Sequence, residues 1–233
     1  MSDTQKVWVV VEMGDEKVKP ASFEAIHAAR LLADSVQGTV EALCLSHKKF
    51  DQEDDLLHYG ADQVSILKNP ILDKFSLELW LHTIVPQVME RKPYAVFIPA
   101  TTHGKELAAS LSAKLNVGLA TDCVGIEAGG QEEIVIRRPV YAGKATSHLI
   151  LRGSGPHILS LRPNVFRGQG PDLSRTGDVD VLAVQIPEDN LFLKVRELVK
   201  EAGKNLDVTE ARVVISGGLG MQDPENFKLL EDL

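Results

Sequence analysis

YAVFIPATTHGKELAASLSAKL, residues 94–115, contains a buried strand and the helix that directly follows it. The apolar run Tyr94–Pro99 predicts a strand, and Thr101 or Thr102 is expected to cap a helix that continues to Leu115. Three leucines recur every fourth residue along that helix and so share one face: Leu107, Leu111 and Leu115. The stretch therefore predicts one strand–helix unit with a very short connection.

The same alternation runs back to the N-terminus. Apolar strands are predicted at Lys6–Met13, Thr39–Leu45 and Gln63–Leu67, and helices at 20–36, after the acidic run Asp51–Asp55, and at Ser76–Met89. Near-continuous apolar strands such as KVWVVVEM are typical of strands buried on both faces. Strands that alternate with helices through short connections predict an α/β fold with a parallel sheet covered on both faces.

After Gly118 the pattern changes. Four strand candidates follow without a long helix between them: Ala120–Ile126, Glu133–Val140, Thr146–Leu151 and His157–Arg162. We interpret them as a small antiparallel addition to the parallel sheet, followed by a loop and a strand at Val179–Ile186. A helix at Asp189–Ala202 then precedes a last strand, glycine-rich loop and helix at Ala211–Ile215, Gly217–Gly220 and Glu225–Leu233. This last unit lacks partners that would bury its apolar faces.

Composition excludes several classes of protein. The 233 residues carry 25 Lys and Arg against 33 Asp and Glu, a formal charge of −8, and 44% are hydrophobic. This is ordinary globular composition, and its acidity argues against a nucleic-acid partner. No apolar run is long enough to span a bilayer and the N-terminus has no signal-peptide pattern, so we expect no membrane insertion. Cys44 and Cys123 lie in apolar strands, which predicts buried free thiols and a cytoplasmic location.

Common catalytic and metal-binding signatures are missing from the chain, including G-x-S-x-G, H-E-x-x-H and C-x-x-C. Gly104-Lys105 follows a strand and opens a helix, where an anion could bind, although a capped helix start is the preferred interpretation. His58 could share a helical face with Asp54 and Asp55, but no further ligand is spaced to complete a metal site. These motifs therefore identify no catalytic residue, and we expect no metal site.

Ser216-Gly217-Gly218-Leu219-Gly220 is the segment most suggestive of a ligand. A glycine-rich turn between a strand and a helix is consistent with a pyrophosphate cradle, because close backbone approach tolerates no Cβ. The third glycine of the dinucleotide fingerprint is absent, since Met221-Gln222-Asp223 follows. A nucleotide-binding or nucleotide-hydrolysing α/β enzyme therefore stays open as an alternative.

Four segments in order resemble the alpha subunit of electron transfer flavoprotein. They are Val96–Cys123, Arg137–Ala145 (RRPVYAGKA), Ile158–Phe166 (ILSLRPNVF) and Ala211–Leu233 (ARVVISGGLGMQDPENFKLLEDL). With the Lys6–Met13 opening, the resemblance covers essentially the whole chain.

The resemblance implies three parts. Residues 1–187 would form a Rossmann-like N-terminal domain with its small antiparallel addition, residues 188–208 a linker helix, and residues 209–233 the start of an incomplete FAD-binding domain, a truncated second α/β domain. Gly218, Leu219 and Gly220 would line the cofactor. Family members usually have arginine where this chain has Leu219, which puts that contact in doubt.

The function implied by the resemblance is electron transport. A heterodimer with a beta subunit would carry electrons on FAD from flavoprotein dehydrogenases, such as the acyl-CoA dehydrogenases of fatty acid beta-oxidation, to a quinone reductase or another acceptor. This chain would be mainly scaffold and dimer interface, with no catalytic residue of its own, and AMP is expected only in the beta subunit. We expect FAD in the complete protein and not on this chain alone.

Overall fold

The chain is described here from a computed structural model, which covers residues 5–14, 17–47, 51–129, 133–168, 170–186, 191–192 and 213–233. It divides into two compact units, residues 1–197 and 198–233. The expected linker helix at 188–208 lies almost wholly outside the described residues. The division into parts 1–187, 188–208 and 209–233 therefore stays a prediction.

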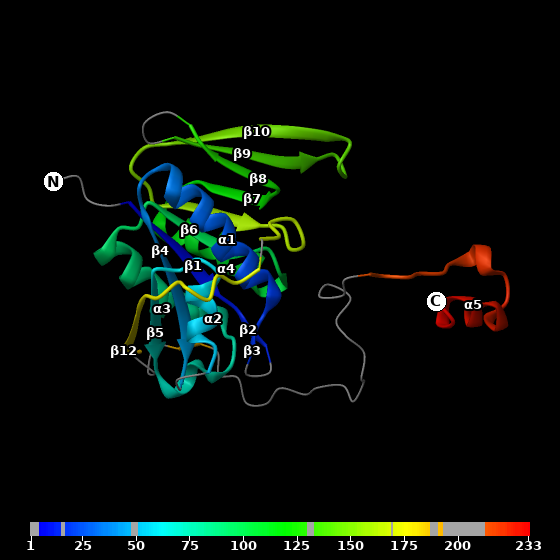
Figure 1. The fold of residues 1–233 in the computed structure, drawn as a ribbon, viewed down its shortest axis with the longest axis horizontal. Coiled ribbons are helices and arrows are strands. Elements are labelled where there is room, and N and C mark those ends of the chain that lie inside the picture. The colour runs from blue at the N-terminus through cyan, green and yellow to red at the C-terminus, as the bar shows by residue number, and fades with distance from the viewer. Residues whose placement is uncertain are drawn as a thin grey trace. The chain divides into compact units, whose positions relative to one another are not determined.

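The first unit is built on a seven-stranded sheet (Figure 1). Its order is β12-β5-β4-β1-β6-β11-β7, and every neighbouring pair is parallel. The strands are β1 (Lys6–Val11), β4 (Thr39–Ser46), β5 (Gln63–Lys68), β6 (Ala95–Pro99), β7 (Leu119–Cys123), β11 (His157–Leu161) and β12 (Asp178–Ala183). The predicted parallel sheet is confirmed.

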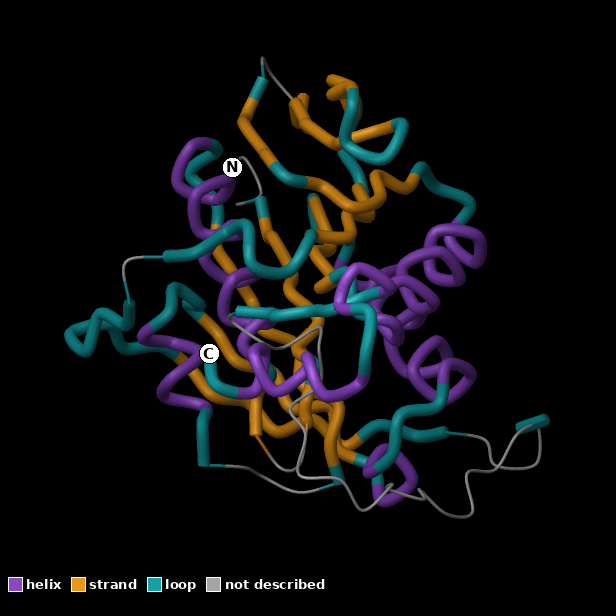
Figure 2. The backbone as a smooth tube through the Cα atoms, turned by 90° about the vertical axis from the view of Figure 1, so that its right-hand side faces the viewer, coloured by secondary structure: helices purple, strands orange, loops and turns teal. Residues whose placement is uncertain are grey.

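Helices cover both faces of this sheet (Figure 2). They are α1 (Pro20–Ser35), α2 (Glu53–His58), α3 (Leu77–Arg91) and α4 (Thr102–Leu115), with a 3-10 turn at Pro70–Asp73 and a short hairpin of β2 (Met13–Gly14) and β3 (Lys17–Val18). Alternate residues of β1 enter two separate cores: Val7 and Val9 pack with α1 and α2, whereas Trp8 packs with α3 and α4. The near-continuous apolar sequence of β1 is therefore required by burial on both faces.

A three-stranded antiparallel sheet, ordered β10-β9-β8, lies above the parallel sheet in Figure 1. Its strands are β8 (Gly125–Ala128), β9 (Glu133–Val140) and β10 (Ala145–Arg152). One face of β9 and β10 packs on the core, with Ile134 and Ile136 fully buried. The predicted antiparallel addition is confirmed in this smaller form.

Two details of the prediction for this region were wrong. The expected strand His157–Arg162 is β11, which joins the parallel sheet beside β6. The expected strand Ala120–Ile126 is divided between the two sheets, as β7 and β8. The division follows from Asp122, whose φ is +57°, and from the backbone N–H of Val124, which turns away to donate to the carbonyl of Arg137. A residue in the left-handed region breaks the alternation of a strand.

The second unit contains short elements among its described residues, 213–233. They are 3-10 turns at Leu219–Met221 and Pro224–Phe227 and the helix α5 (Lys228–Glu231). The predicted strand Ala211–Ile215 does not form over 213–215, and residues 211 and 212 lie outside the description. The predicted helix Glu225–Leu233 is reduced to a 3-10 turn and one α-helical turn. Both outcomes agree with the lack of a partner strand in the described part of this unit.

Both cysteines are buried free thiols, as predicted. Burial raises the pKa of each thiol, that of Cys123 to about 12. Within the described ranges, no helix has the length and apolar character needed to cross a membrane.

Candidate functional site

The order of the strands places a crevice between β1 and β6. The chain runs from β1 to β4 and β5 on one side of the sheet and returns to β6 on the other, so the carboxyl ends of β1 and β6 flank a topological switch point. Open α/β sheets commonly bind ligands at such a point. The crevice is very small, with a volume of about 10 Å³. Typical ligand pockets are roughly 300–1,000 Å³.

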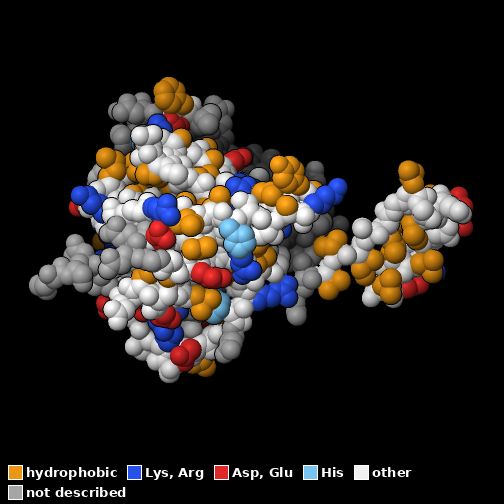
Figure 3. Space-filling view, turned by 90° about the horizontal axis from the view of Figure 1, so that it is seen from above, with side chains coloured by type: hydrophobic (Ala, Val, Ile, Leu, Met, Phe, Trp, Pro, Cys, Tyr) orange, Lys and Arg blue, Asp and Glu red, His pale blue; other side chains and the backbone are white. Residues whose placement is uncertain are grey.

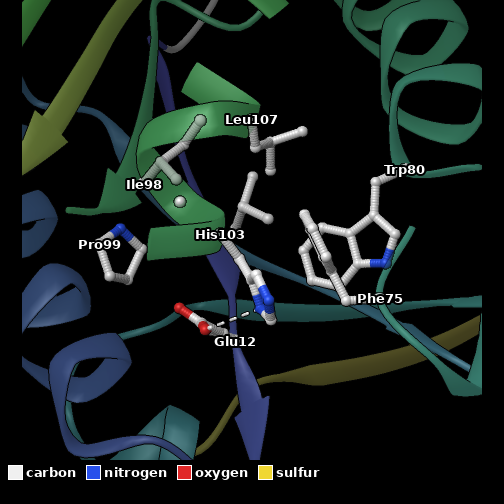
Figure 4. Close-up of a pocket in the computed structure, with 9 residues that line it drawn as sticks. Glu12, Phe75, Trp80, Ile98, Pro99, His103 and Leu107 are labelled. Atoms are coloured by element: carbon white, nitrogen blue, oxygen red, sulfur yellow. Dashed lines mark ion pairs between the residues drawn. The ribbon is translucent and has the colours of Figure 1, made fainter. Parts of the chain in front are cut away.

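The carboxylate of Glu12 occupies the polar side of this crevice (Figure 4). Glu12 directly follows β1, and its Oε2 accepts a hydrogen bond of 2.5 Å from the hydroxyl of Thr101. Its Oε1 lies 2.9 Å from Nζ of Lys19 and 3.7 Å from Nδ1 of His103. A negative charge of the chain itself thus stands at the N-terminus of α4, where the helix dipole favours it.

The other side of the crevice is closed by rings. The ring of Phe75 stacks on His103 with centroids 4.0 Å apart and meets the edge of Trp80 at 5.1 Å. Figure 4 shows Phe75 and His103 side by side, with His103 directed toward Glu12. Aromatic contact on one side and a carboxylate on the other leave little room for a bound molecule.

Gly104 and Lys105 form a capped helix start, as the preferred interpretation expected. The backbone N–H of Gly104 donates to Oγ1 of Thr101 at 3.0 Å. A Cβ on Gly104 would lie 1.8 Å from the carbonyl oxygen of Pro99, so close packing of α4 on β6 accounts for the glycine. An anion at this helix start would meet the carboxylate of Glu12, which argues against the anion-binding alternative.

Glu12 and His103 were not singled out in the sequence. A usable signal was present for Glu12, because a carboxylate at the end of the otherwise apolar run KVWVVVE lies at the carboxyl edge of a central strand. The stacking of Phe75 on His103 had no such signal, because Phe75 comes from a connection whose path depends on the whole fold.

A second polar cluster lies at the same edge of the sheet, beside β7 and β11. Arg162 donates through Nε and Nη2 to the two carboxylate oxygens of Asp122, with the Nε contact at 2.9 Å. This hydrogen bonding is the main reason that the pKa of Asp122 falls below its usual range, and the positive charges of Lys105 and Arg138 lower it further. Three cations therefore act on one carboxylate, and a net positive charge remains.

His58 stays apart from these clusters at the end of α2, and its carbonyl accepts from the backbone N–H of Asp172. Among the residues that the structure describes, no three His, Cys, Asp or Glu side chains are placed to share a metal ion.

The glycine-rich segment of the second unit is an exposed turn. The side chain of Leu219 is fully exposed, and a Cβ added at Gly218 or Gly220 would meet open space. Gly217 is different, because a Cβ there would lie 2.6 Å from the Leu230 side chain. The packing of this unit therefore explains Gly217 and leaves Gly218 and Gly220 without a packing reason.

The comparisons with known proteins agree on one family. Residues 7–187 match the model of the electron transfer flavoprotein domain. The electron transfer flavoprotein subunit alpha of Clostridium acetobutylicum is 29% identical over 235 residues, covering 100% of this chain and 70% of that protein. The subunit alpha of Bacillus subtilis is 30% identical and covers 98% of this chain and 69% of that protein.

A further relative carries a different name. The lactate dehydrogenase (NAD(+),ferredoxin) subunit LctC of Acetobacterium woodii is 25% identical over 97% of this chain and 54% of its own length. The matched domain covers more than half of the present chain, and the relatives named subunit alpha align across nearly all of it. The chain therefore belongs to the electron transfer flavoprotein domain family and is alpha-subunit-like throughout its length.

Proposed function

We propose that this chain acts as the alpha subunit of a heterodimeric electron transfer flavoprotein. In this role it assembles with a beta subunit, and the complex carries electrons from flavoprotein dehydrogenases to a quinone reductase or another acceptor. The observation that carries the proposal is the alignment of relatives named subunit alpha across both units, including the Ser216–Gly220 segment. Acyl-CoA dehydrogenases, and with them fatty acid beta-oxidation, are the proposed electron source, and the proposed location is cytoplasmic.

The first unit has the features of a scaffold in this proposal. Its switch point is small and carries the Glu12 carboxylate, which would repel the phosphates of a nucleotide. The alternative of a nucleotide-binding or nucleotide-hydrolysing enzyme relied on Gly104-Lys105 and on Ser216–Gly220, and the first of these is a capped helix start. We accordingly propose that the chain supplies no catalytic residue and that AMP binds in the beta subunit only.

The proposed FAD contacts are Gly218, Leu219 and Gly220. The open space beside the two glycines would admit a pyrophosphate close to the backbone, where a Cβ would obstruct it. Leu219 offers no hydrogen-bond donor or charge from its side chain, unlike arginine at this position. The described residues of the second unit thus fit FAD only in part. We propose that the complete protein holds FAD, which supplies its redox chemistry, and that this chain alone does not retain it.

Co-expression with the beta subunit from the same genome tests the assignment. We expect the two chains to elute together from a sizing column, and the 233-residue chain purified alone to show no flavin absorbance. Calorimetry of the lone chain with AMP and with ATP distinguishes the subunit from the alternative. Tight binding of either nucleotide would support a nucleotide-binding or nucleotide-hydrolysing enzyme. A chain that stays alone in the presence of the beta subunit contradicts the subunit assignment, and stoichiometric FAD on the lone chain contradicts the proposed incomplete flavin site.

A further inference from the structure

The β9–β10 hairpin ends in a strained turn that presents an aromatic ring. The hairpin tip, residues 141–144, is closed by hydrogen bonds from the N–H of Gly143 to the carbonyl of Val140 and from the N–H of Lys144 to the carbonyl of Tyr141. Tyr141 and Ala142 have φ of +53° and +54°. L-residues reach this region only at a conformational cost, and such strain gathers at functional sites.

The Tyr141 side chain at this turn is 81% exposed, so the described residues of the first unit leave most of its ring uncovered. Exposed tyrosines of this kind often anchor protein interfaces, since a large rigid ring buries much area at a low entropy cost. Contacts of the Tyr141 side chain with the described residues of the first unit therefore do not offset the conformational cost of its backbone.

Charge gathers on the same hairpin. Residues 133–152 carry four cations and one carboxylate, a formal charge of +3 in a chain whose total is −8. Arg152 pairs with Glu133 at 2.7 Å, and Arg137 lies 3.9 Å from Glu127. Arg138 lies on the inner face, where its charge acts on Asp122, whereas Lys144 at the tip forms no ion pair among the described residues. The hairpin thus has positive charge in excess.

The outer face of the hairpin adds apolar area. Ile150 is 50% exposed on β10 and stands opposite Val135 on β9, while the inner face is buried in the core. The far edge of β10 pairs with no strand among the described residues. Figure 3, which looks onto this side of the unit, shows Lys and Arg side chains beside exposed hydrophobic ones. Interfaces combine these features, an apolar centre with an aromatic anchor and polar surroundings.

We propose that the hairpin tip docks on an acidic surface of the partner subunit, where Tyr141 fills a pocket and Lys144 faces a carboxylate. The proposal rests on the proposed heterodimer and specifies one of its contact surfaces. The charge complementarity favours an acidic protein surface, because a hairpin of +3 on a chain of −8 attracts an acidic partner that the rest of the chain repels.

Titration of the 233-residue chain with the purified beta subunit tests this inference. Tyr141→Gly removes the ring and also the strain, so we expect it to melt no lower than the unaltered chain and to bind the beta subunit at least about tenfold more weakly. A destabilised fold would lower both the melting temperature and the affinity for the beta subunit. Measuring the two together therefore distinguishes loss of docking from loss of structure. Lys144→Glu should weaken binding most at low salt, because screening removes the charge contribution.

Matched controls come from the same unit. Leu173→Ala alters another exposed apolar side chain, and Lys68→Glu makes the same charge change at the end of β5; both should bind like the unaltered chain. Binding of Tyr141→Gly and Lys144→Glu within twofold of these controls overturns the docking surface and leaves the heterodimer intact. Failure of the unaltered chain to bind contradicts the proposed function, and the inference with it.

Discussion

A buried ion pair joins the C-terminus of α3 to the sheet. Glu41 on β4 is only 2% exposed, and both of its carboxylate oxygens lie 2.5 Å from Nη2 of Arg91, the last residue of α3. The hydroxyl of Ser65 donates to the same carboxylate at 2.5 Å, and the guanidinium of Arg91 lies 4.7 Å from the ring centroid of Trp8. One helix and three strands therefore meet at this pair.

Removal of Arg91 and removal of Glu41 should lower the stability of the first unit by different amounts. Arg91→Met leaves the Glu41 carboxylate buried with Ser65 alone, and an uncompensated buried charge costs about 3–5 kcal/mol. Because the Arg91 side chain is 21% exposed, water can enter when it is shortened, so we expect about 3 kcal/mol. Glu41→Gln leaves the Arg91 guanidinium in contact with the Trp8 ring and with some solvent. We therefore expect a smaller loss of stability, about 1–2 kcal/mol. The double variant should be more stable than the sum of the single losses implies, by about 2 kcal/mol.

Urea unfolding followed by tryptophan fluorescence measures these differences, because both tryptophans, Trp8 and Trp80, are buried in the first unit. Arg152→Met is the control, since its 2.7 Å pair with Glu133 is mostly solvent-exposed and should cost less than about 1 kcal/mol. Losses that add within about 0.5 kcal/mol in the double variant would refute coupling between Glu41 and Arg91.

Three further outcomes follow from single residues. Gly104→Ala should lower the stability of the first unit by roughly 2–3 kcal/mol in thermal melts, because its Cβ would strike the Pro99 carbonyl, whereas Gly118→Ala, which has open space, should be neutral. The raised thiol pKa values of Cys44 and Cys123 predict no labelling by a thiol reagent in the native state and labelling of both on unfolding; fast native labelling would contradict their burial. Because the folded pKa of Asp122 lies below its unfolded value, its contribution is complete above about pH 4 and is lost as pH falls through the folded pKa. Asparagine also tolerates the left-handed backbone, so in Asp122→Asn the urea midpoint should fall less steeply with decreasing pH than in the unaltered chain. Equal slopes for the two proteins would contradict a stabilising role of the ion pair with Arg162.

The sequence predicted the parallel core because its signals are local. The β1 run alternates between two cores, so all of its residues are apolar, and Thr101 occupies the cap position that the turn requires. The helices α1, α3 and α4 begin within one residue of their predicted positions, where Pro20, Ser76 and Thr101 mark the starts.

Long-range contacts explain what the sequence did not predict. The division at Asp122 depends on Arg162, forty residues later, and on the pairing of Val124 with Arg137, which no local pattern encodes. Parallel pairing of β11 with β6 likewise depends on the path of the chain and not on the apolar sequence of β11. For the candidate site, Glu12 was visible as a charge at a strand end, but its hydrogen bond with Thr101 joins residues 89 positions apart.

The position of β12 has a consequence for synthesis on the ribosome. β12 pairs with β5 from Asp178↔Gln63 to Ala183↔Lys68, so each pair joins residues 115 apart. The nascent chain therefore carries β5 with an open edge until residue 183 has left the exit tunnel, and contacts this distant in sequence form slowly. An open, apolar strand edge invites pairing with other chains, so β5 is exposed to such pairing during the interval before β12 arrives.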